Sequence, residues 1–168
     1  MKKTQKLLFI GEGQTEDALV GNLFQGKVKI FNLAHNSISK IIRTIPKPNE
    51  VSIFFFFYTD ILIDAKKLAC LIQNIEYLKR MKYSISILQQ KDDLEEELAK
   101  ACSCNIRELL RYTQCSSKSE LKSKFIKNPS CVLNHPNFDI NKLWATPLIE
   151  NLSDYQDLQI NASNLATK

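Results

Sequence analysis

Acidic side chains recur in three short segments of this 168-residue sequence, and their grouping suits metal-dependent chemistry. The segments are residues 11–16, 59–64 and 91–97, and each follows an apolar run. In a parallel sheet the carboxyl ends of the strands meet at one edge, where α/β proteins bind ligands. Carboxylates gathered there repel one another, and Mg²⁺ or Mn²⁺ relieves that repulsion. The candidate metal ligands are Glu12, Asp60, Asp64, Asp92 and Asp93.

The elements that must position these acids can be predicted from the apolar pattern. Continuous apolar runs predict buried strands over residues 6–10, 28–33, 51–58 and 84–89. Apolar residues at helical spacing predict helices over residues 15–24, 37–45 and 64–81. This alternation is typical of an α/β fold, and right-handed crossovers make a four-stranded sheet mostly parallel, with helices on both faces.

The first acidic segment has two interpretations. Gly11 and Gly13 flank Glu12, so the backbone can turn sharply and a phosphate can approach without meeting a Cβ atom. A helix beginning near Thr15 would direct free N–H groups at the same anion. Alternatively, a strand-to-helix turn uses glycine and a capping threonine for purely local reasons.

The stretch from Leu7 to Glu16, LLFIGEGQTE, resembles the opening strand and motif of Toprim (topoisomerase–primase) domains. It is most similar to the V-E-G-x-T-E form of overcoming-lysogenization-defect nucleases and related small bacterial proteins. The resemblance implies a Rossmann-like three-layer sandwich and a Mg²⁺- or Mn²⁺-dependent phosphodiester hydrolase acting on nucleic acid in bacterial defence or repair. It implies that Glu12 is the catalytic acid/base or a ligand, that Asp60 is a ligand, and that an ATPase encoded nearby is a partner.

The second acidic segment departs from the Toprim pattern. An Asp-x-Asp pair is expected there, but Leu62 occupies the second position and Asp64 follows two residues later. If a helix begins near residue 61, Asp60 and Asp64 lie one turn apart and can share an ion. If the helix begins at Asp64, that residue is its N-cap. The departure favours an alternative function, a catalytically inactive binding or regulatory protein. A third interpretation, a receiver-like phosphoacceptor at Asp60, lacks the expected acidic pair after the first strand.

The third acidic segment also has two interpretations. Acidic residues at a helix start complement the helix dipole and face solvent. Asp92 and Asp93 lie nearest the strand end and are the better ligand candidates, with Glu96 about one turn away. Leu94 and Leu98 should face the core of the protein.

The charge permits a nucleic-acid partner. The net charge is +5, and residues 1–149, with 22 basic and 15 acidic side chains, carry +7. Lysines that could follow a phosphate backbone are Lys118, Lys122, Lys124 and Lys127. A solvated helix face balanced by Glu120 is the simpler explanation.

We expect a Toprim-like core over residues 1–100, a helical extension packed on it over 101–150, and a weakly ordered tail over 151–168. Capping-box spacings at 105–108 and 117–120 predict helices in the extension. The aromatic residues Tyr112, Phe125 and Trp144 are expected in the core. Five cysteines without metal-site spacing, and no signal peptide or membrane-length apolar run, predict a soluble cytoplasmic protein with reduced thiols.

Overall fold

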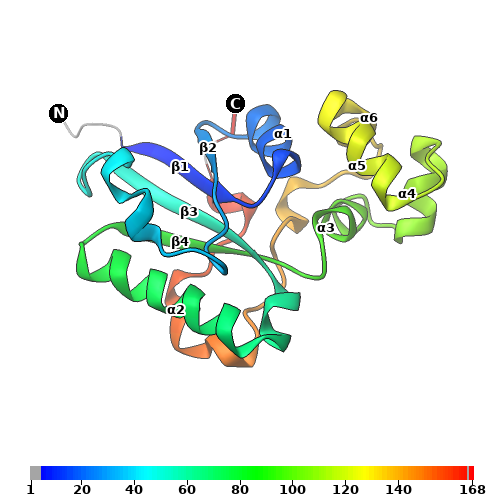
Figure 1. Cartoon of the computed structure of the whole chain (residues 1–168). Coiled ribbons are helices and arrows are strands. Elements are labelled where there is room, and N and C mark those ends of the chain that lie inside the picture. The colour runs from blue at the N-terminus through cyan, green and yellow to red at the C-terminus, as the bar shows by residue number, and fades with distance from the viewer. Residues whose placement is uncertain (1–4, 166) are drawn as a thin grey trace.

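The fold is built on a four-stranded sheet with strand order β2-β1-β3-β4, in which every neighbouring pair runs parallel (Figure 1). The structure is a computed structural model that describes residues 5–165 and 167–168, and only the backbone of residues 61 and 62. Residues 1–4 of the expected core and residue 166 of the expected tail lie outside the described part. The strands are β1 (Lys6–Gly11), β2 (Lys27–Ile30), β3 (Val51–Tyr58) and β4 (Ser84–Gln90).

Helices connect and follow these strands. The α-helices are α1 (Gln14–Leu23), α2 (Ala65–Arg80), α3 (Leu94–Ala101), α4 (Ile106–Thr113), α5 (Lys118–Lys127) and α6 (Ser130–Leu133). The 3-10 helices are η1 (Ile38–Lys40), η2 (Ile42–Thr44), η3 (Thr59–Ile63), η4 (Ile140–Lys142), η5 (Glu150–Leu158) and η6 (Ala162–Asn164). The predicted α/β class is confirmed, and a mostly parallel sheet proves to be entirely parallel.

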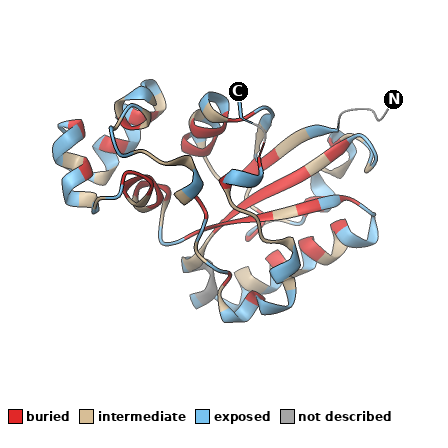
Figure 2. Ribbon diagram, turned by 180° about the vertical axis from the view of Figure 1, so that it is seen from behind, coloured by how far each residue is buried: buried red, intermediate tan, exposed pale blue. Residues whose placement is uncertain are grey.

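Strand β3 lies between β1 and β4 and is buried from both sides, as its continuous apolar sequence predicts (Figure 2). Alternate residues of β3 enter two separate cores. Phe54 and Phe56 join the side chains of α1 and α3–α5, whereas Phe55 and Phe57 join those of α2 and η1. The molecule is therefore a three-layer, Rossmann-like arrangement with helices on both faces of the sheet.

The helix predicted over residues 37–45 is wrong. Two short 3-10 helices, η1 and η2, replace it. The reason is tertiary: the buried Asn74 side chain of α2 accepts a hydrogen bond from Ile38 N at 2.7 Å and donates to Leu33 O and Asn36 O. These bonds hold residues 33–38 against α2, and the β-branched isoleucines that follow favour an α-helix only weakly.

Helices α3–α6 form the extension after the sheet, and α5 packs against α1. Asn105 and Glu108 form the predicted capping box of α4. Phe125 and Trp144 are fully buried, as expected. The prediction that Tyr112 lies in the core is wrong, because this residue is 46% exposed. The ring of Tyr112 instead packs edge-on against the ring of His135, with 4.3 Å between the two ring centroids.

The last residues lie along the sheet and α1. Ile160 N donates to Ile87 O of β4 at 3.2 Å, and Lys168 N donates to Leu23 O at 3.1 Å. Leu152 and Ala162 are buried on opposite faces of the sheet. Among the described residues, no helix has the length and apolar character needed to cross a membrane.

Candidate active site

The loop after β1 is shaped by close packing at Gly11. A Cβ atom at this position would lie 3.0 Å from Phe56 Cδ2 and 3.2 Å from Glu16 Cβ, so a larger residue would displace one of them. Gly13, by contrast, has an extended backbone with φ −153°, which any residue can adopt. Gly13 occupies the N-cap position of α1 without a capping side chain. The glycine motif therefore has a packing reason at Gly11 and leaves the first turn of α1 uncapped.

Glu16 is a buried partner of Tyr58, and the residue is only 1% exposed. The Tyr58 hydroxyl at the end of β3 donates a hydrogen bond to Glu16 Oε1. Burial raises the pKa of Tyr58, and the negative charge of Glu16 raises it further, so the hydroxyl keeps its proton and stays a donor. Glu16 was not predicted as a site residue, although it is the last residue of the recognised motif.

The charge of Asp60 influences the pKa of Glu12 at the carboxyl edge of the sheet. Burial raises the pKa of Glu12, and the carboxylates of Glu16 and Asp60 raise it further. Lys67 of α2 and Lys122 of α5 oppose this shift. Two of the predicted ligands, Glu12 and Asp60, therefore follow neighbouring strands at this edge, and the charge of Asp60 acts on Glu12.

Asp64 and Asp93 have structural roles as helix caps. Asp64 accepts hydrogen bonds from Lys66 N and Lys67 N at the start of α2, so the N-cap alternative for this residue is confirmed. Those backbone bonds lower its pKa. Asp93 caps α3 by accepting from Glu96 N at 2.9 Å.

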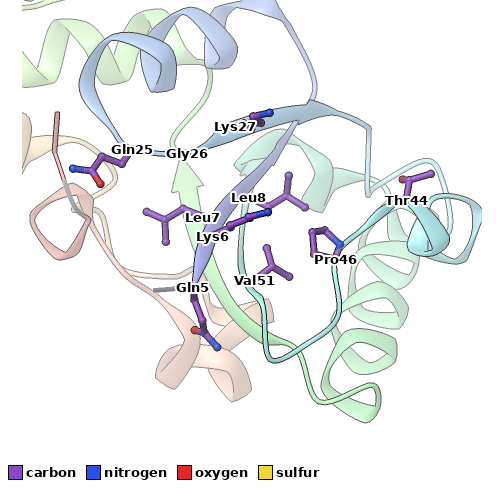
Figure 3. A pocket seen from close by; sticks show the side chains of 10 residues that line it. All are labelled: Gln5, Lys6, Leu7, Leu8, Gln25, Gly26, Lys27, Thr44, Pro46 and Val51. Atoms are coloured by element: carbon purple, nitrogen blue, oxygen red, sulfur yellow. The ribbon is translucent and has the colours of Figure 1, made fainter. Parts of the chain in front are cut away.

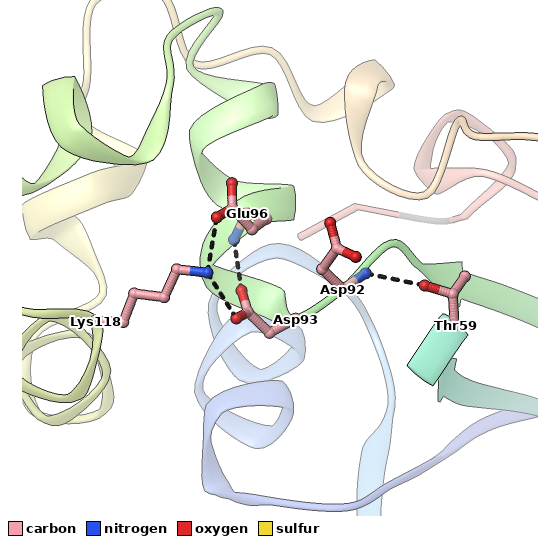
Figure 4. A network of polar contacts seen from close by, with 5 residues as sticks. All are labelled: Thr59, Asp92, Asp93, Glu96 and Lys118. Carbon is pink, nitrogen blue, oxygen red and sulfur yellow. Dashed lines mark hydrogen bonds and ion pairs between the residues drawn. The ribbon is translucent and has the colours of Figure 1, made fainter. Parts of the chain in front are cut away.

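Asp92 is held by its backbone, as Figure 4 shows. Its N–H donates to Thr59 Oγ1 at 3.1 Å, which ties the loop after β4 to the loop after β3. Its φ of 61° lies in the left-handed region, which is uncommon for a residue other than glycine, asparagine or aspartate. The two acidic loops at the sheet edge are thereby connected directly.

The four candidate lysines differ in their surroundings. Lys118 forms ion pairs with Asp93 Oδ2 at 2.9 Å and Glu96 Oε1 at 2.7 Å, joining α5 to the start of α3 (Figure 4). Lys124 donates to Thr113 O. Lys122 is exposed, and its charge opposes the rise in the pKa of both Glu12 and Glu95. Lys127 has no hydrogen bond or ion pair within the described part of the chain.

Buried polar groups without partners among the described residues lie at the same edge, and no sequence pattern predicted them. Glu95 is 7% exposed, and its Oε1 atom has no hydrogen-bond partner among the described residues. Burial, followed by the charge of Asp93, raises its pKa. The side chains of Gln90 and Thr15 are likewise buried and unpartnered there. Each such group costs about 1–3 kcal/mol, which ordered water or a ligand recovers.

The donor chemistry of Glu12 and Asp60 fits a hard divalent cation. Mg²⁺ is commonly bound by one or two carboxylates together with water and substrate phosphate. In the described part of the chain, no three Asp, Glu, His or Cys side chains are arranged so that they could hold a metal ion by themselves.

A cavity of about 600 Å³ lies at the opposite, amino end of the strands (Figure 3). Its lining includes Lys6, Lys27 and Val51, with Leu7 and Leu8 from β1, and contains no acidic side chain. It is separate from the acidic edge and offers no carboxylate to a cation.

Comparisons of the chain with models of protein families, with curated proteins and with solved structures give no match. The resemblance to Toprim domains therefore rests on residues 7–16 and on the placement of Asp60.

Proposed function

We propose that this chain is a Toprim-like phosphodiester hydrolase that acts on nucleic acid with Mg²⁺ or Mn²⁺. The observation that supports it best is the placement of Glu12 and Asp60 directly after the neighbouring strands β1 and β3, at the carboxyl edge of an entirely parallel sheet. This edge is where α/β folds bind ligands. A setting in bacterial defence or repair, with a nearby-encoded ATPase as partner, follows from the same resemblance.

The residues of the chain have separable roles in this proposal. Glu12 is either the acid/base or a ligand of the cation, and in the first role its raised pKa brings the carboxyl group closer to neutral pH, where an acid/base works well. Lys122 and Lys67 attract the phosphate, since both lie close enough to influence Glu12. The uncapped N–H groups of α1 add a weaker attraction for the same anion.

The divalent cation would be held by Glu12 and Asp60 together with substrate oxygens. It would supply stabilisation of the negative charge that develops on the phosphoryl group. Asp64 and Asp93 are engaged as helix caps, so we assign them to positioning the loops. Glu16 accepts a hydrogen bond from Tyr58, so we assign it too to positioning the loop.

A second function, a Toprim-like binding or regulatory protein without catalysis, is favoured by one observation. Within the described residues no set of three potential ligands can hold a metal ion alone. Calorimetry separates the two functions. Binding of Mn²⁺ that depends on Glu12 supports the enzyme, and no binding at millimolar Mn²⁺ supports the regulatory protein.

The deciding experiment compares Glu12→Gln with the native chain in Mg²⁺- or Mn²⁺-dependent cleavage of DNA and RNA. We expect cleavage by the native protein and a loss of at least 100-fold in the variant, because acid–base catalysis contributes about 10²–10⁴-fold. Circular dichroism checks that the variant is folded.

Asp17→Asn is the matched control, since Asp17 is an exposed acid in the first turn of α1, the helix that follows the Glu12 loop. It removes the same charge beside the same loop and should leave cleavage within about twofold of native, a margin typical of surface changes. Cleavage that survives in Glu12→Gln would remove Glu12 from the mechanism. Absence of cleavage of any DNA or RNA by the native chain would refute the proposed activity.

A further inference from the structure

Lys118, the first residue of α5, connects two helices of the extension at the acidic edge (Figure 4). Its ammonium group lies 2.9 Å from Asp93 Oδ2 and 2.7 Å from Glu96 Oε1, at the start of α3. The three side chains are between 34% and 40% exposed, so solvent screens these ion pairs only in part. An ammonium group that pairs with two carboxylates has less freedom to contact a substrate phosphate, which indicates a different role for Lys118.

The segment that Lys118 contacts is dense in negative charge. Five of the six residues from 92 to 97 are acidic. Within the described part of the chain, both ion pairs made by this segment come from Lys118. Like charges one helical turn apart repel each other. Loss of the Lys118 charge should therefore loosen the loop between β4 and α3.

A second contact joins the same loop to the loop after β3. Asp92 directly precedes Asp93, and its N–H donates to Thr59 Oγ1 at 3.1 Å. This bond lies just beyond the last paired residues of β3 and β4. Thr59 in turn directly precedes Asp60, one of the two candidate ligands. A short path of bonds and contacts therefore leads from α5 to the backbone that carries Asp60.

We propose that Lys118 is a positioning residue for the candidate cation site. Its ion pair with Asp93 fixes the loop after β4. The hydrogen bond from Asp92 to Thr59 then fixes the backbone beside Asp60. A ligand that is already held in place binds a cation more tightly, because binding has less ordering to do. The inference rests on the proposed function, since it takes Asp60 as a cation ligand.

The test measures the Mn²⁺ and nucleic-acid dependence of the full chain separately. Lys118→Met removes the charge and keeps most of the side-chain length. We expect the Mn²⁺ concentration for half-maximal cleavage, and the Mn²⁺ Kd from calorimetry, to rise about three- to tenfold, because two partly exposed ion pairs are lost. The KM for DNA or RNA should stay within about twofold of native, a margin typical of surface changes. Lys118→Arg can form the same ion pairs and should restore the native Mn²⁺ dependence.

Asp93→Ser tests the path from the other side. Serine keeps an N-cap for α3 but cannot form an ion pair with Lys118. It should also raise the Mn²⁺ requirement, and adding it to Lys118→Met should cause no further rise, because the two changes remove a shared contact. Lys79→Met is the matched control, since Lys79 pairs with Glu76 in the last turn of α2 and its side chain is 43% exposed. It should leave the Mn²⁺ dependence unchanged.

The outcomes separate this inference from the proposed function. A rise in the KM for nucleic acid that equals or exceeds the rise in the Mn²⁺ requirement would make Lys118 a phosphate contact and overturn the inference. No change in either quantity, or an equal effect of Lys79→Met, would also overturn it. If the native chain neither binds Mn²⁺ nor cleaves nucleic acid, the proposed function fails instead.

In that case the amide N–H resonances of Asp60 and Asp92 decide whether Lys118 fixes the two loops. Lys118→Met should shift both resonances and Lys79→Met should shift neither. Resonances that stay unshifted in Lys118→Met would overturn the inference.

Discussion

The hydrogen bond between Tyr58 and Glu16 should be a strong stabilising contact, and a double-mutant cycle can measure it. Tyr58→Phe removes the hydroxyl that donates to Glu16 Oε1 and leaves the carboxylate of this buried residue without that partner. Hydrogen bonds to charged groups contribute about 1.5–3 kcal/mol, and burial places this one toward the upper end. We expect Tyr58→Phe to lower the free energy of unfolding by about 2–3 kcal/mol at pH 7.

Glu16→Gln keeps an acceptor for the Tyr58 hydroxyl but removes the charge. The cycle formed by Tyr58→Phe, Glu16→Gln and the double variant should give a coupling of about 1–2 kcal/mol between the two positions. Urea unfolding followed by circular dichroism provides the free energies, and equal m-values show that the unfolding transition is comparable. Additive single-variant effects, within about 0.5 kcal/mol, would refute the inference that Tyr58 holds Glu16 in place.

Two further predictions concern buried polar side chains. Asn74→Ala should lower the free energy of unfolding by about 3 kcal/mol in urea titration, because it leaves Ile38 N and two carbonyl oxygens without their partner. The exposed Asn22→Ala should change it by less than about 0.5 kcal/mol, and similar losses would contradict the role of Asn74. Glu95→Gln should stabilise the protein at pH 7, because burial raises the pKa of Glu95 above 4.5 and the native fold loses stability as pH rises through the shifted value. The gain should vanish below pH 4.5, where the carboxyl group is neutral in both states, and a gain that persists there would contradict titration of Glu95 as its cause.

Much of the sheet could be predicted from the sequence, because burial on both faces leaves a continuous apolar run. The strand predicted over 51–58 matches β3 at both ends, and the helix predicted over 64–81 matches α2 with Asp64 as its cap. Leu94 and Leu98 are buried as expected. These features depend on the spacing of apolar residues along one strand or helix, and a short stretch of sequence is enough to show that spacing.

The parts that the sequence did not predict depend on contacts between distant residues. Glu16 and Tyr58 are 42 positions apart, and no local pattern shows that the two side chains will form a buried hydrogen bond. Lys118 and Asp93 are 25 positions apart, so the lysine could be recognised as basic but not as an ion-pair partner. Tyr112 has a large aromatic side chain of the kind found in cores, yet its position in the short helix α4 leaves it 46% exposed.

The motif after β1 serves the buried pair as well as the candidate acid. Glu16 approaches the strand end closely enough that a Cβ at Gly11 would lie 3.2 Å from Glu16 Cβ, and from there its carboxylate reaches Tyr58. The negative charge that Tyr58 anchors is the first charged group raising the pKa of Glu12. Gly11 therefore permits the packing, Glu16 supplies the charge, and Glu12 responds to it, so the spacing of the three residues has a physical reason within the fold itself. A substrate phosphate is not needed to explain Gly11, and the case for catalysis rests instead on Glu12, Asp60 and the charge of Lys122.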